Sequence, residues 1–428
     1  MDRVSTRLWY SLYNLLLYVG VVVCLPFWLV VRFVRGRYRG QFKERMGVLS
    51  DEVLARFGER PALWVHAASA GETASAVPLV RALKAQWPDR PLLFTVTSRY
   101  GKEMAGRQLA DLADAICFSP LDLPFFCRRY LNAARPFLYV MVETDIWPNI
   151  LRKAQRRGIP CVLASGYASP RNFPRSFWRA VFTHIDLFLM QTGEDAKNIV
   201  ARGAVADRVS VAGNMKFDST AGAVPADEIP ALREDFGIPE GVPVFVAGST
   251  LHEDEAPMLD AIATVRGEGV DLHAILAPRR QEHVAEVVRG LEERGLPWVR
   301  RTEGGRAPIL VLDTMGELAR TYNLASVAYV GGGFTPDVGL HNLIEPLVCG
   351  CPVLFGPHRG KAARVAQEIL RTGAGREVAD GAALLGAMRE ILTDPARAAQ
   401  LVEAGHVLLA DNQGAAERQA EKIRSCVP

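Results

Sequence analysis

The chain has 428 residues, of which 49% are hydrophobic and 23% charged, and this composition excludes a disordered or fibrous protein. At roughly 150 residues per domain, the length predicts two or three domains. Lysine and arginine number 50 against 47 acidic residues, and so small a surplus does not favour nucleic acid as a partner. The 7 cysteines form no CxxC pair, which indicates reduced thiols in a cytosolic compartment.

The N-terminal segment is predicted to be a membrane anchor. No charged side chain occurs between Leu8 and Val31, and as a helix at about 1.5 Å per residue this stretch is about 36 Å long, enough for a ~30 Å hydrocarbon layer. It exceeds the apolar region of a signal peptide, and no A-x-A-like cleavage site follows it. Pro26 leaves open whether the helix spans the membrane or dips into one leaflet.

Basic residues are concentrated after this stretch and are sparse before it. Such an asymmetry predicts that the body of the protein lies in the cytoplasm. The cluster should also attract anionic lipid headgroups. The residues after the stretch are Arg32, Arg35, Arg37, Arg39, Lys43 and Arg45, against Arg3 and Arg7 before it.

Short apolar runs alternate with longer amphipathic stretches in the rest of the chain, which predicts parallel strands in βαβ units. One series of strand-like runs covers 62–68, 91–98, 137–143, 161–166 and 209–213, and a second covers 243–249, 272–278, 309–313, 327–333 and 352–357. The segment between the two series is rich in Pro, Gly, Ala and charge, as in a linker. We therefore predict an anchor with its basic flank (1–40), an N-terminal Rossmann-like domain (41–218), a linker (219–242), a C-terminal Rossmann-like domain (243–410) and a final helix (411–428) that can cross back to the first domain.

Two such sheets facing each other would form a cleft at the carboxyl ends of their strands, where α/β folds bind ligands. The motif 66-HAASAGE-72 follows the first strand. Ser69 and Glu72 there form an S-x-x-E capping box, so both can simply satisfy helix-end amides. The carboxylate of Glu72 could equally act as a general base toward a hydroxyl group. The residues alone leave both interpretations open.

Two further motifs end strands of the first series, 143-ETDIWPNI-150 and 213-GNMKFD-218. Glu143 and Asp145 could orient a polar substrate, or Asp145 or Thr144 could cap the next helix. Lys216 could supply positive charge to an anionic transition state. A solvated lysine is the plainer alternative.

In the second series, 248-GSTLHEDE-255 closes a strand and opens a helix, so Ser249 and Thr250 can present amides and hydroxyls to a phosphate. Arg279, in 277-APRRQEH-283, could hold a phosphate bidentately or pair with Glu282 on the surface. In 331-GGGFTPDVGLHNLIEP-346 the glycines let the backbone approach a ligand, and Glu345 suits the cis-diol of a ribose. Together these motifs predict a nucleotide site.

The ordered series SAGE, ETDIWPN, GNMKFD, GST, PRR, DTMGEL and HNLIEP resembles the 3-deoxy-D-manno-octulosonic acid (Kdo) transferases of glycosyltransferase family 30. These are GT-B enzymes with an N-terminal membrane anchor. The resemblance covers nearly the whole chain. His252 is displaced by one place from the histidine usual in the family, so we assign it no role.

The resemblance implies an inverting transfer of Kdo from CMP-Kdo to the lipid A precursor lipid IVA, in lipopolysaccharide synthesis at the cytoplasmic face of the inner membrane. No cofactor is expected, and because no DxD-type metal motif occurs near the predicted cleft, a phosphate held by Arg279 and helix N-termini predicts transfer without a metal. It implies that Glu72 is the general base and that Glu143 and Lys216 stabilise the transition state. The implied CMP contacts are Pro278, Arg279, Gly316, Glu317, Leu318, Asn342, Leu343, Ile344 and Glu345.

Two alternatives remain. A GT-B enzyme acting on a UDP-sugar, such as a 2-epimerase or another glycosyltransferase, would share the glycine-rich loop and Glu345, but would not account for the anchor, SAGE and GNMKFD together. A catalytically inactive, membrane-anchored nucleotide-binding module would need none of Glu72, Glu143 and Lys216.

Overall fold

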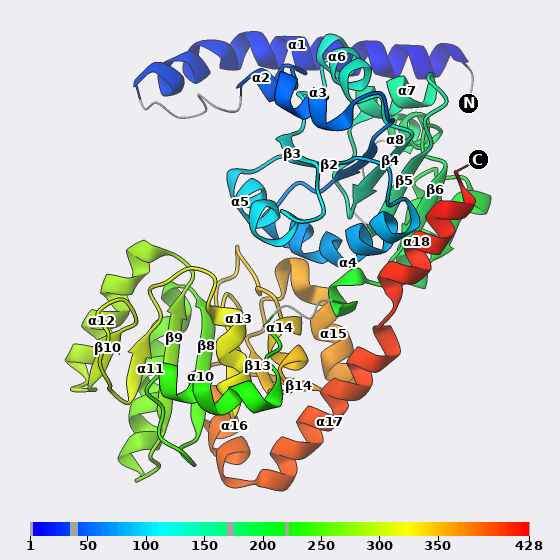
Figure 1. Cartoon of the computed structure of the whole chain (residues 1–428). Coiled ribbons are helices and arrows are strands. Elements are labelled where there is room, and N and C mark those ends of the chain that lie inside the picture. Colours follow the sequence, from blue (N-terminus) through cyan, green and yellow to red (C-terminus); the bar gives the residue numbers. More distant parts are fainter. Residues whose placement is uncertain (1–2, 35–41, 169–174, 219–221, 428) are drawn as a thin grey trace. The chain divides into compact units, whose positions relative to one another are not determined.

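The computed structural model describes residues 3–34, 42–168, 175–218 and 222–427. It contains two compact units (Figure 1). Unit 1 comprises the chain up to Asp218 and again from Gly414, and unit 2 comprises residues 219–413. Each unit is built on one parallel sheet flanked by helices, which confirms the predicted α/β class.

The sheet of unit 1 has 7 parallel strands in the order β3-β2-β1-β4-β5-β6-β7. Its central strands are buried along their whole length and are mostly apolar, as expected where helices cover both faces. The strands are β1 (Leu63–His66), β2 (Leu92–Val96), β3 (Ala115–Phe118), β4 (Leu138–Val142), β5 (Cys161–Gly166), β6 (Leu187–Met190) and β7 (Val209–Val211).

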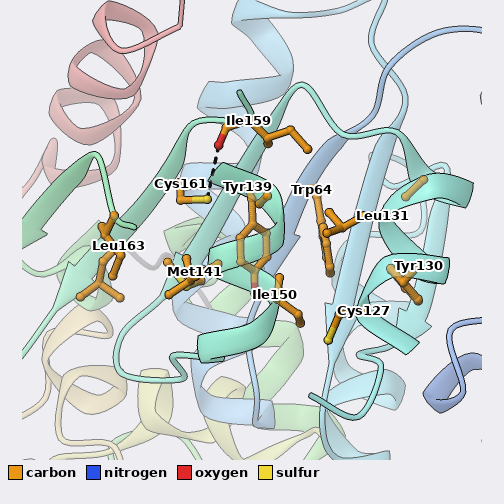
Figure 2. Close-up of a cluster of buried hydrophobic side chains, with 14 of the residues drawn as sticks. Trp64, Cys127, Tyr130, Leu131, Tyr139, Met141, Ile150, Ile159, Cys161 and Leu163 are labelled. Carbon is orange, nitrogen blue, oxygen red and sulfur yellow. Dashed lines mark hydrogen bonds between the residues drawn. The ribbon is translucent and has the colours of Figure 1, made fainter. Parts of the chain in front are cut away.

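Helices bury both faces of this sheet in two hydrophobic clusters. One cluster lies beneath α3 and α6 to α9, and Figure 2 shows its centre, where Trp64 and Tyr139 stack with ring centroids 4.4 Å apart. The other lies beneath α4, α5 and α18. The helices are α2 (Phe42–Arg45), α3 (Asp51–Phe57), α4 (Ala70–Gln86), α5 (Arg99–Gln108), α6 (Pro124–Ala134), α7 (Pro148–Gln155), α8 (Arg175–Phe182), α9 (Gly193–Ala201), η1 (Ala206–Arg208), η2 (Met215–Asp218) and α18 (Ala415–Ser425).

The N-terminal helix α1 (Arg3–Val34) contains one stretch, Thr6–Cys24, that is long and apolar enough to cross a membrane. Polar side chains also attach it to unit 1. The buried Tyr10 hydroxyl donates to Pro148 O at 3.1 Å, and Asn149 Nδ2 donates to Asn14 Oδ1 at 2.7 Å. Large apolar side chains of this helix are exposed: Leu8, Leu12, Leu15, Leu16, Tyr18, Val19, Val21, Val22 and Val23.

The basic flank is only partly described. Arg35, Arg37 and Arg39 lie outside the described residues, whereas Arg45 is held within unit 1, where its guanidinium donates to Thr97 O at 2.6 Å. Lys102, a basic residue outside the flank, pairs with the Glu44 carboxylate of the same unit at 2.9 Å.

The last helix of the chain, α18, completes unit 1. The Asp218 carboxylate accepts hydrogen bonds from Gly414 N and Ala416 N, both at 2.6 Å, at the start of this helix. Further along α18, Gln419 Oε1 accepts from Ser165 N at 2.8 Å and its Nε2 donates to Gly213 O at 3.0 Å. These hydrogen bonds therefore attach α18 to Gly213 and Asp218, on either side of the start of η2.

Unit 2 repeats the architecture with 7 parallel strands in the order β10-β11-β9-β8-β12-β13-β14. Hydrophobic clusters cover both faces of this sheet. The strands are β8 (Val244–Thr250), β9 (His273–Pro278), β10 (Trp298–Arg300), β11 (Ile309–Val311), β12 (Val327–Val330), β13 (Val353–Phe355) and β14 (Gly375–Glu377).

Unit 2 includes the segment that was predicted to be a linker. Within the predicted linker, α10 buries Leu232 in the unit 2 core, and Phe236 and Ile238 follow it there. Within the segment predicted to hold the final helix, α18 covers Ala415–Ser425, and Gly414, with a φ of 77°, separates it from α17. The helices are η3 (Ala226–Glu228), α10 (Ile229–Asp235), α11 (His252–Gly267), η4 (Gln281–His283), α12 (Val284–Glu293), α13 (Leu318–Thr321), η5 (Tyr322–Leu324), α14 (Ile344–Val348), η6 (Gly360–Ala362), α15 (Ala363–Thr372), α16 (Gly381–Thr393) and α17 (Pro395–Asn412).

Candidate functional site

Several of the candidate residues lie where the strand order of each sheet reverses, among them Glu72, Glu143 and Ser249. In unit 1 the chain runs outward in opposite directions from the adjacent strands β1 and β4, and in unit 2 from β8 and β12. Doubly wound sheets bind ligands at the carboxyl ends of such neighbouring strands, because the following loops separate there. The motif 66-HAASAGE-72 lies at the carboxyl end of β1, and the motif 248-GSTLHEDE-255 lies at the carboxyl end of β8.

Glu72 lies in the first turn of α4, directly after β1. Its Oε2 accepts hydrogen bonds from Ala68 N at 2.6 Å and Ser69 N at 3.2 Å, and Ser69 Oγ accepts from Glu72 N at 3.3 Å. The capping box is therefore formed. Burial, followed by the nearby charge of Glu143, raises the pKa of the Glu72 carboxyl. A carboxylate with a raised pKa is better matched to accepting a proton near neutral pH.

Glu143 directly follows β4 and is buried, and it pairs with Lys216 from η2. Lys216 Nζ lies 2.8 Å from Glu143 Oε1, and Ser75 Oγ donates to the same oxygen at 3.4 Å. Glu143 has a φ of 64°, in the left-handed region that a residue with a side chain seldom occupies. Such backbone strain is typical of functional sites. The structure thus brings Glu72, Glu143 and Lys216 into one neighbourhood.

A buried histidine network lies beside these residues and was not predicted. His66 Nε2 is 2.7 Å from Asp145 Oδ2, and its Nδ1 is 2.9 Å from Thr95 Oγ1. Trp147 Nε1 and Thr97 Oγ1 donate to the same Asp145 oxygen at 3.0 and 3.2 Å. Burial opposes ionisation of Asp145, but the hydrogen bonds led by His66 outweigh it and lower its pKa.

Asp145 is therefore fixed as an anionic group and does not cap the next helix. The amides at the start of α7 are satisfied by another residue: Asp122 accepts from Asn149 N at 2.9 Å and Ile150 N at 3.0 Å. The capping alternative for Asp145 is wrong for this reason. A quarter of the Asp145 side chain is exposed, so the anion remains accessible to a ligand.

In unit 2, the carboxyl end of β8 has the features of a phosphate site. Ser249 has a φ of 57°, and the buried Thr250 Oγ1 has no hydrogen-bond partner among the described residues. Gly331, at the end of β12, packs so closely that an added Cβ would lie 2.5 Å from Ser249 O. The glycine is thus required for the two strand ends to meet.

Asp254 organises this region and was also not predicted. Fully buried in the first turn of α11, it accepts hydrogen bonds from Leu251 N at 2.9 Å, Gly332 N at 2.7 Å and the Tyr329 hydroxyl at 2.7 Å. One carboxylate therefore fixes the start of α11 and the glycine-rich loop together. The sequence carries no capping signature here, because Leu251 at the N-cap position has no side-chain acceptor.

Arg279, His341 and Glu345 come together around this loop. Burial and then the charge of Arg279 lower the pKa of His341 to about 4, so the imidazole is neutral at pH 7, and its buried Nε2 has no hydrogen-bond partner among the described residues. Burial raises the pKa of Glu345, while the hydrogen bond from Asn342 Nδ2 at 3.0 Å and the charge of Arg279 oppose this. Arg280, and not Arg279, pairs with Glu282 at 3.3 Å.

Other predicted nucleotide contacts are placed differently. Glu317 pairs with Arg301 at 3.1 Å. Burial opposes ionisation of the Glu317 carboxyl, but the hydrogen bonds from Arg301 and Thr314 outweigh burial and lower the pKa of Glu317. Leu343 and Ile344 are buried in unit 2, so they can offer a ligand only backbone atoms. Pro278 is half-buried at the end of β9, Gly316 is exposed, and Leu318 lies near Gly248.

Comparison with known proteins identifies relatives along the whole chain. A family model described as 3-Deoxy-D-manno-octulosonic-acid transferase (kdotransferase) matches residues 40–219. The 3-deoxy-D-manno-octulosonic acid transferase of Bordetella pertussis is 30% identical over 395 residues, which cover 86% of this chain and 90% of that protein. The transferase of the same name from Chlamydophila psittaci is 28% identical over 431 residues, covering 99% and 98%.

Among solved structures, Anabaena HepE in complex with UDP is similar with a TM-score of 0.59 and 14% identity, over 85% of this chain and 99% of that one. At this identity the similarity shows the fold alone. The two-sheet architecture is thus shared with a protein that binds a UDP nucleotide.

Proposed function

This chain belongs to the 3-deoxy-D-manno-octulosonic acid transferase family, and we propose that it transfers Kdo from CMP-Kdo to a lipid A precursor with inversion at the anomeric carbon. The observation that carries this proposal is the similarity to transferases of this name over nearly the full length of both chains. The position of Glu72 and Glu143 after β1 and β4, and of Ser249 at the end of β8, supports it, because these strands lie at the reversal point of each sheet.

In the proposed reaction, an acceptor hydroxyl attacks the anomeric carbon of Kdo while the bond from that carbon to the CMP phosphate oxygen breaks. Glu72 takes the hydroxyl proton as the new glycosidic bond forms. Its raised pKa, due to burial and Glu143, supports this role. CMP leaves carrying the electron pair of the broken bond.

Unit 2 is the proposed CMP-binding unit. The unpartnered Thr250 Oγ1 and His341 Nε2, with Arg279 close enough to influence His341, offer hydrogen-bond donors and a positive charge to a phosphate. Ser249 would present its backbone at the same turn. Glu345 is proposed to accept hydrogen bonds from the ribose hydroxyls.

In unit 1, Lys216 is proposed to stabilise the charge that develops in the transition state. Its 2.8 Å ion pair with Glu143 fixes the ammonium group in place. A preorganised charge of this kind contributes to catalysis without reorganisation during the reaction. Glu143 therefore both positions Lys216 and raises the pKa of Glu72.

The proposed location is the cytoplasmic face of the inner membrane, with α1 as the anchor. Its apolar stretch Thr6–Cys24 and the outward apolar face support membrane association. The basic residues that follow this stretch in the sequence support a cytoplasmic body. A lipid acceptor embedded in the same membrane would be within reach of an anchored enzyme.

One experiment tests the function directly. Purified full-length protein in detergent is incubated with CMP-Kdo and lipid IVA, and separately with UDP-sugars, while nucleotide release and lipid products are measured by mass spectrometry. We expect release of CMP with formation of a Kdo-lipid product. Turnover of a UDP-sugar alone would indicate another GT-B enzyme, and CMP-Kdo binding without turnover would indicate an inactive binding module.

A further inference from the structure

Four potential metal ligands meet where α11 begins and α12 approaches it. Ligand atoms of His252, Glu255 and Glu286 all lie within 4.8 Å of one another. His252 Nδ1 is 3.1 Å from Glu286 Oε2, and His283 Nδ1 is 3.8 Å from Glu255 Oε1. The set combines two imidazoles with two carboxylates, a donor set that zinc accepts.

A second observation points to a ligand at this cluster. The Glu255 side chain is only 7% exposed, yet its Oε1 has no hydrogen-bond partner among the described residues, and neither has the buried Nδ1 of His283. Buried polar atoms are normally satisfied, and exceptions call for an explanation such as an ion. A cation between these two atoms would satisfy both.

The neighbouring carboxylates of the cluster favour a cation. Ligand oxygens of Glu255 and Glu286 lie within 4.8 Å of each other. Two neighbouring carboxylates repel each other when both are ionised, and a divalent cation removes this repulsion. His252 and Glu286 are 73% and 43% exposed, so a metal ion can enter from solvent on their side.

The distances allow a metal ion after small side-chain movements. In a tetrahedral zinc site with bonds of about 2.0–2.2 Å, neighbouring ligand atoms are about 3.3–3.6 Å apart. The separation of 3.1 Å between His252 and Glu286 is slightly shorter than this, and that of 3.8 Å between His283 and Glu255 is slightly longer. We propose that His252, Glu255, Glu286 and His283 form a zinc-binding site on unit 2.

This site is distinct from the proposed chemistry of transfer. Its ligands lie on the first turn of α11 and on η4 and α12, and none has been given a role in the reaction. A bound ion would tie these elements together. Because Asp254 on the same turn holds the glycine-rich loop, occupancy should stabilise that loop as well.

The test uses the full-length protein in detergent, stripped of metal with EDTA and then transferred to chelator-free buffer. ZnCl2 is titrated in competition with a chromophoric chelator, and bound metal is counted by elemental analysis. We expect one zinc per chain, much weaker binding of MgCl2, and a higher unfolding temperature when zinc is bound. Absence of zinc binding by the wild-type protein would overturn the proposal.

Variants identify the ligands. His252→Ala and Glu286→Gln alter exposed side chains and should leave the fold intact. Each should weaken zinc binding at least tenfold, because loss of even an outer partner of a metal ligand typically costs 10–100-fold in affinity. Glu255→Gln should do the same. The matched control is His406→Ala, which removes an exposed histidine of unit 2 outside the cluster and should change nothing.

Two further results would contradict the assignment. Wild-type affinity in both His252→Ala and Glu286→Gln would show that zinc binds elsewhere. Wild-type affinity in Glu255→Gln would show that only the surface pair of His252 and Glu286 binds the ion, and not the buried carboxylate on which the proposal depends.

Discussion

The substitution Glu72→Gln separates the two roles of this residue, helix capping and proton transfer. The glutamine carbonyl oxygen can still accept from Ala68 N and Ser69 N, which the Glu72 carboxylate does at 2.6 and 3.2 Å. The loss of stability should therefore be small, about 1 kcal/mol or less. The amide cannot take a proton from the acceptor, so the rate of transfer should fall by about 10²–10⁴-fold.

The matched control is Ser69→Ala. It removes the side chain that accepts from Glu72 N at 3.3 Å, and loss of an N-cap costs about 0.5–2 kcal/mol. The carboxylate remains, so Ser69→Ala should lower the denaturation midpoint of unit 1 and retain most of the transfer activity. Transfer is measured as CMP release from CMP-Kdo on a detergent-dispersed lipid acceptor, and CMP binding by calorimetry should be unchanged in both variants.

The pH dependence gives a second readout of Glu72. The base must be ionised, and its pKa is raised by burial and by Glu143. The protonated, inactive fraction therefore grows as the pH falls toward a value above that of an ordinary glutamate, and the rate should fall with it. Glu72→Gln should lose this acid limb. A near-wild-type rate in Glu72→Gln, or an unchanged acid limb, would refute the assignment and leave capping as the role of Glu72.

Three further predictions concern the nucleotide, the last helix and the anchor. Arg279→Ala should weaken CMP binding by about 1.5–3 kcal/mol. The control Arg280→Ala should have little effect, because Arg280 pairs with Glu282. If calorimetry gave the same CMP dissociation constant for Arg279→Ala and the wild-type protein, Arg279 would be excluded as a phosphate ligand. Asp218→Ala should lower the free energy of unfolding of unit 1 by about 0.5–2 kcal/mol, since it removes the cap of α18, and an unchanged urea midpoint would contradict this. Removal of residues 1–31 should leave CMP binding intact. It should reduce the rate of transfer to a lipid acceptor in vesicles more than the rate of transfer to a detergent-dispersed acceptor. It should also lower the stability of unit 1, because the Tyr10 side chain that it removes is fully buried. Equal rates on vesicles at high salt would show that α1 does not deliver the enzyme to its substrate.

The fold class was predictable because the central strands are buried on both faces and therefore read as continuous apolar runs. The unpredicted strands β3, β6, β10 and β14 lie at or near the sheet edges. Strands at the edge of a sheet have a neighbouring strand on one side only, and a short edge strand such as Gly375–Glu377 is only partly buried. Composition alone cannot distinguish such a strand from a loop. The same limit applied to α10, whose apolar residues are spaced among charged ones.

The site was predictable only where its residues follow a strand in a recognisable motif, as Glu72, Glu143 and Arg279 do. The pair of His66 and Asp145 is separated by 79 positions in the chain, so its contact exists only after β1 and β4 pair. The pairing of Lys216 with Glu143 likewise depends on η2 being brought back to β4. Local sequence carries the chemistry of each side chain, whereas topology decides its partner.

The return of α18 to unit 1 has a consequence for folding during synthesis. Residues 415–425 complete a hydrophobic cluster that includes Leu79 and Met215, yet they are made only after all of unit 2. At roughly 5–20 residues per second, unit 1 waits for tens of seconds with that surface uncovered. Unit 2, whose residues are contiguous, can fold first. A truncated C-terminus would therefore damage the unit that carries Glu72 and Lys216 and spare the one that carries Arg279.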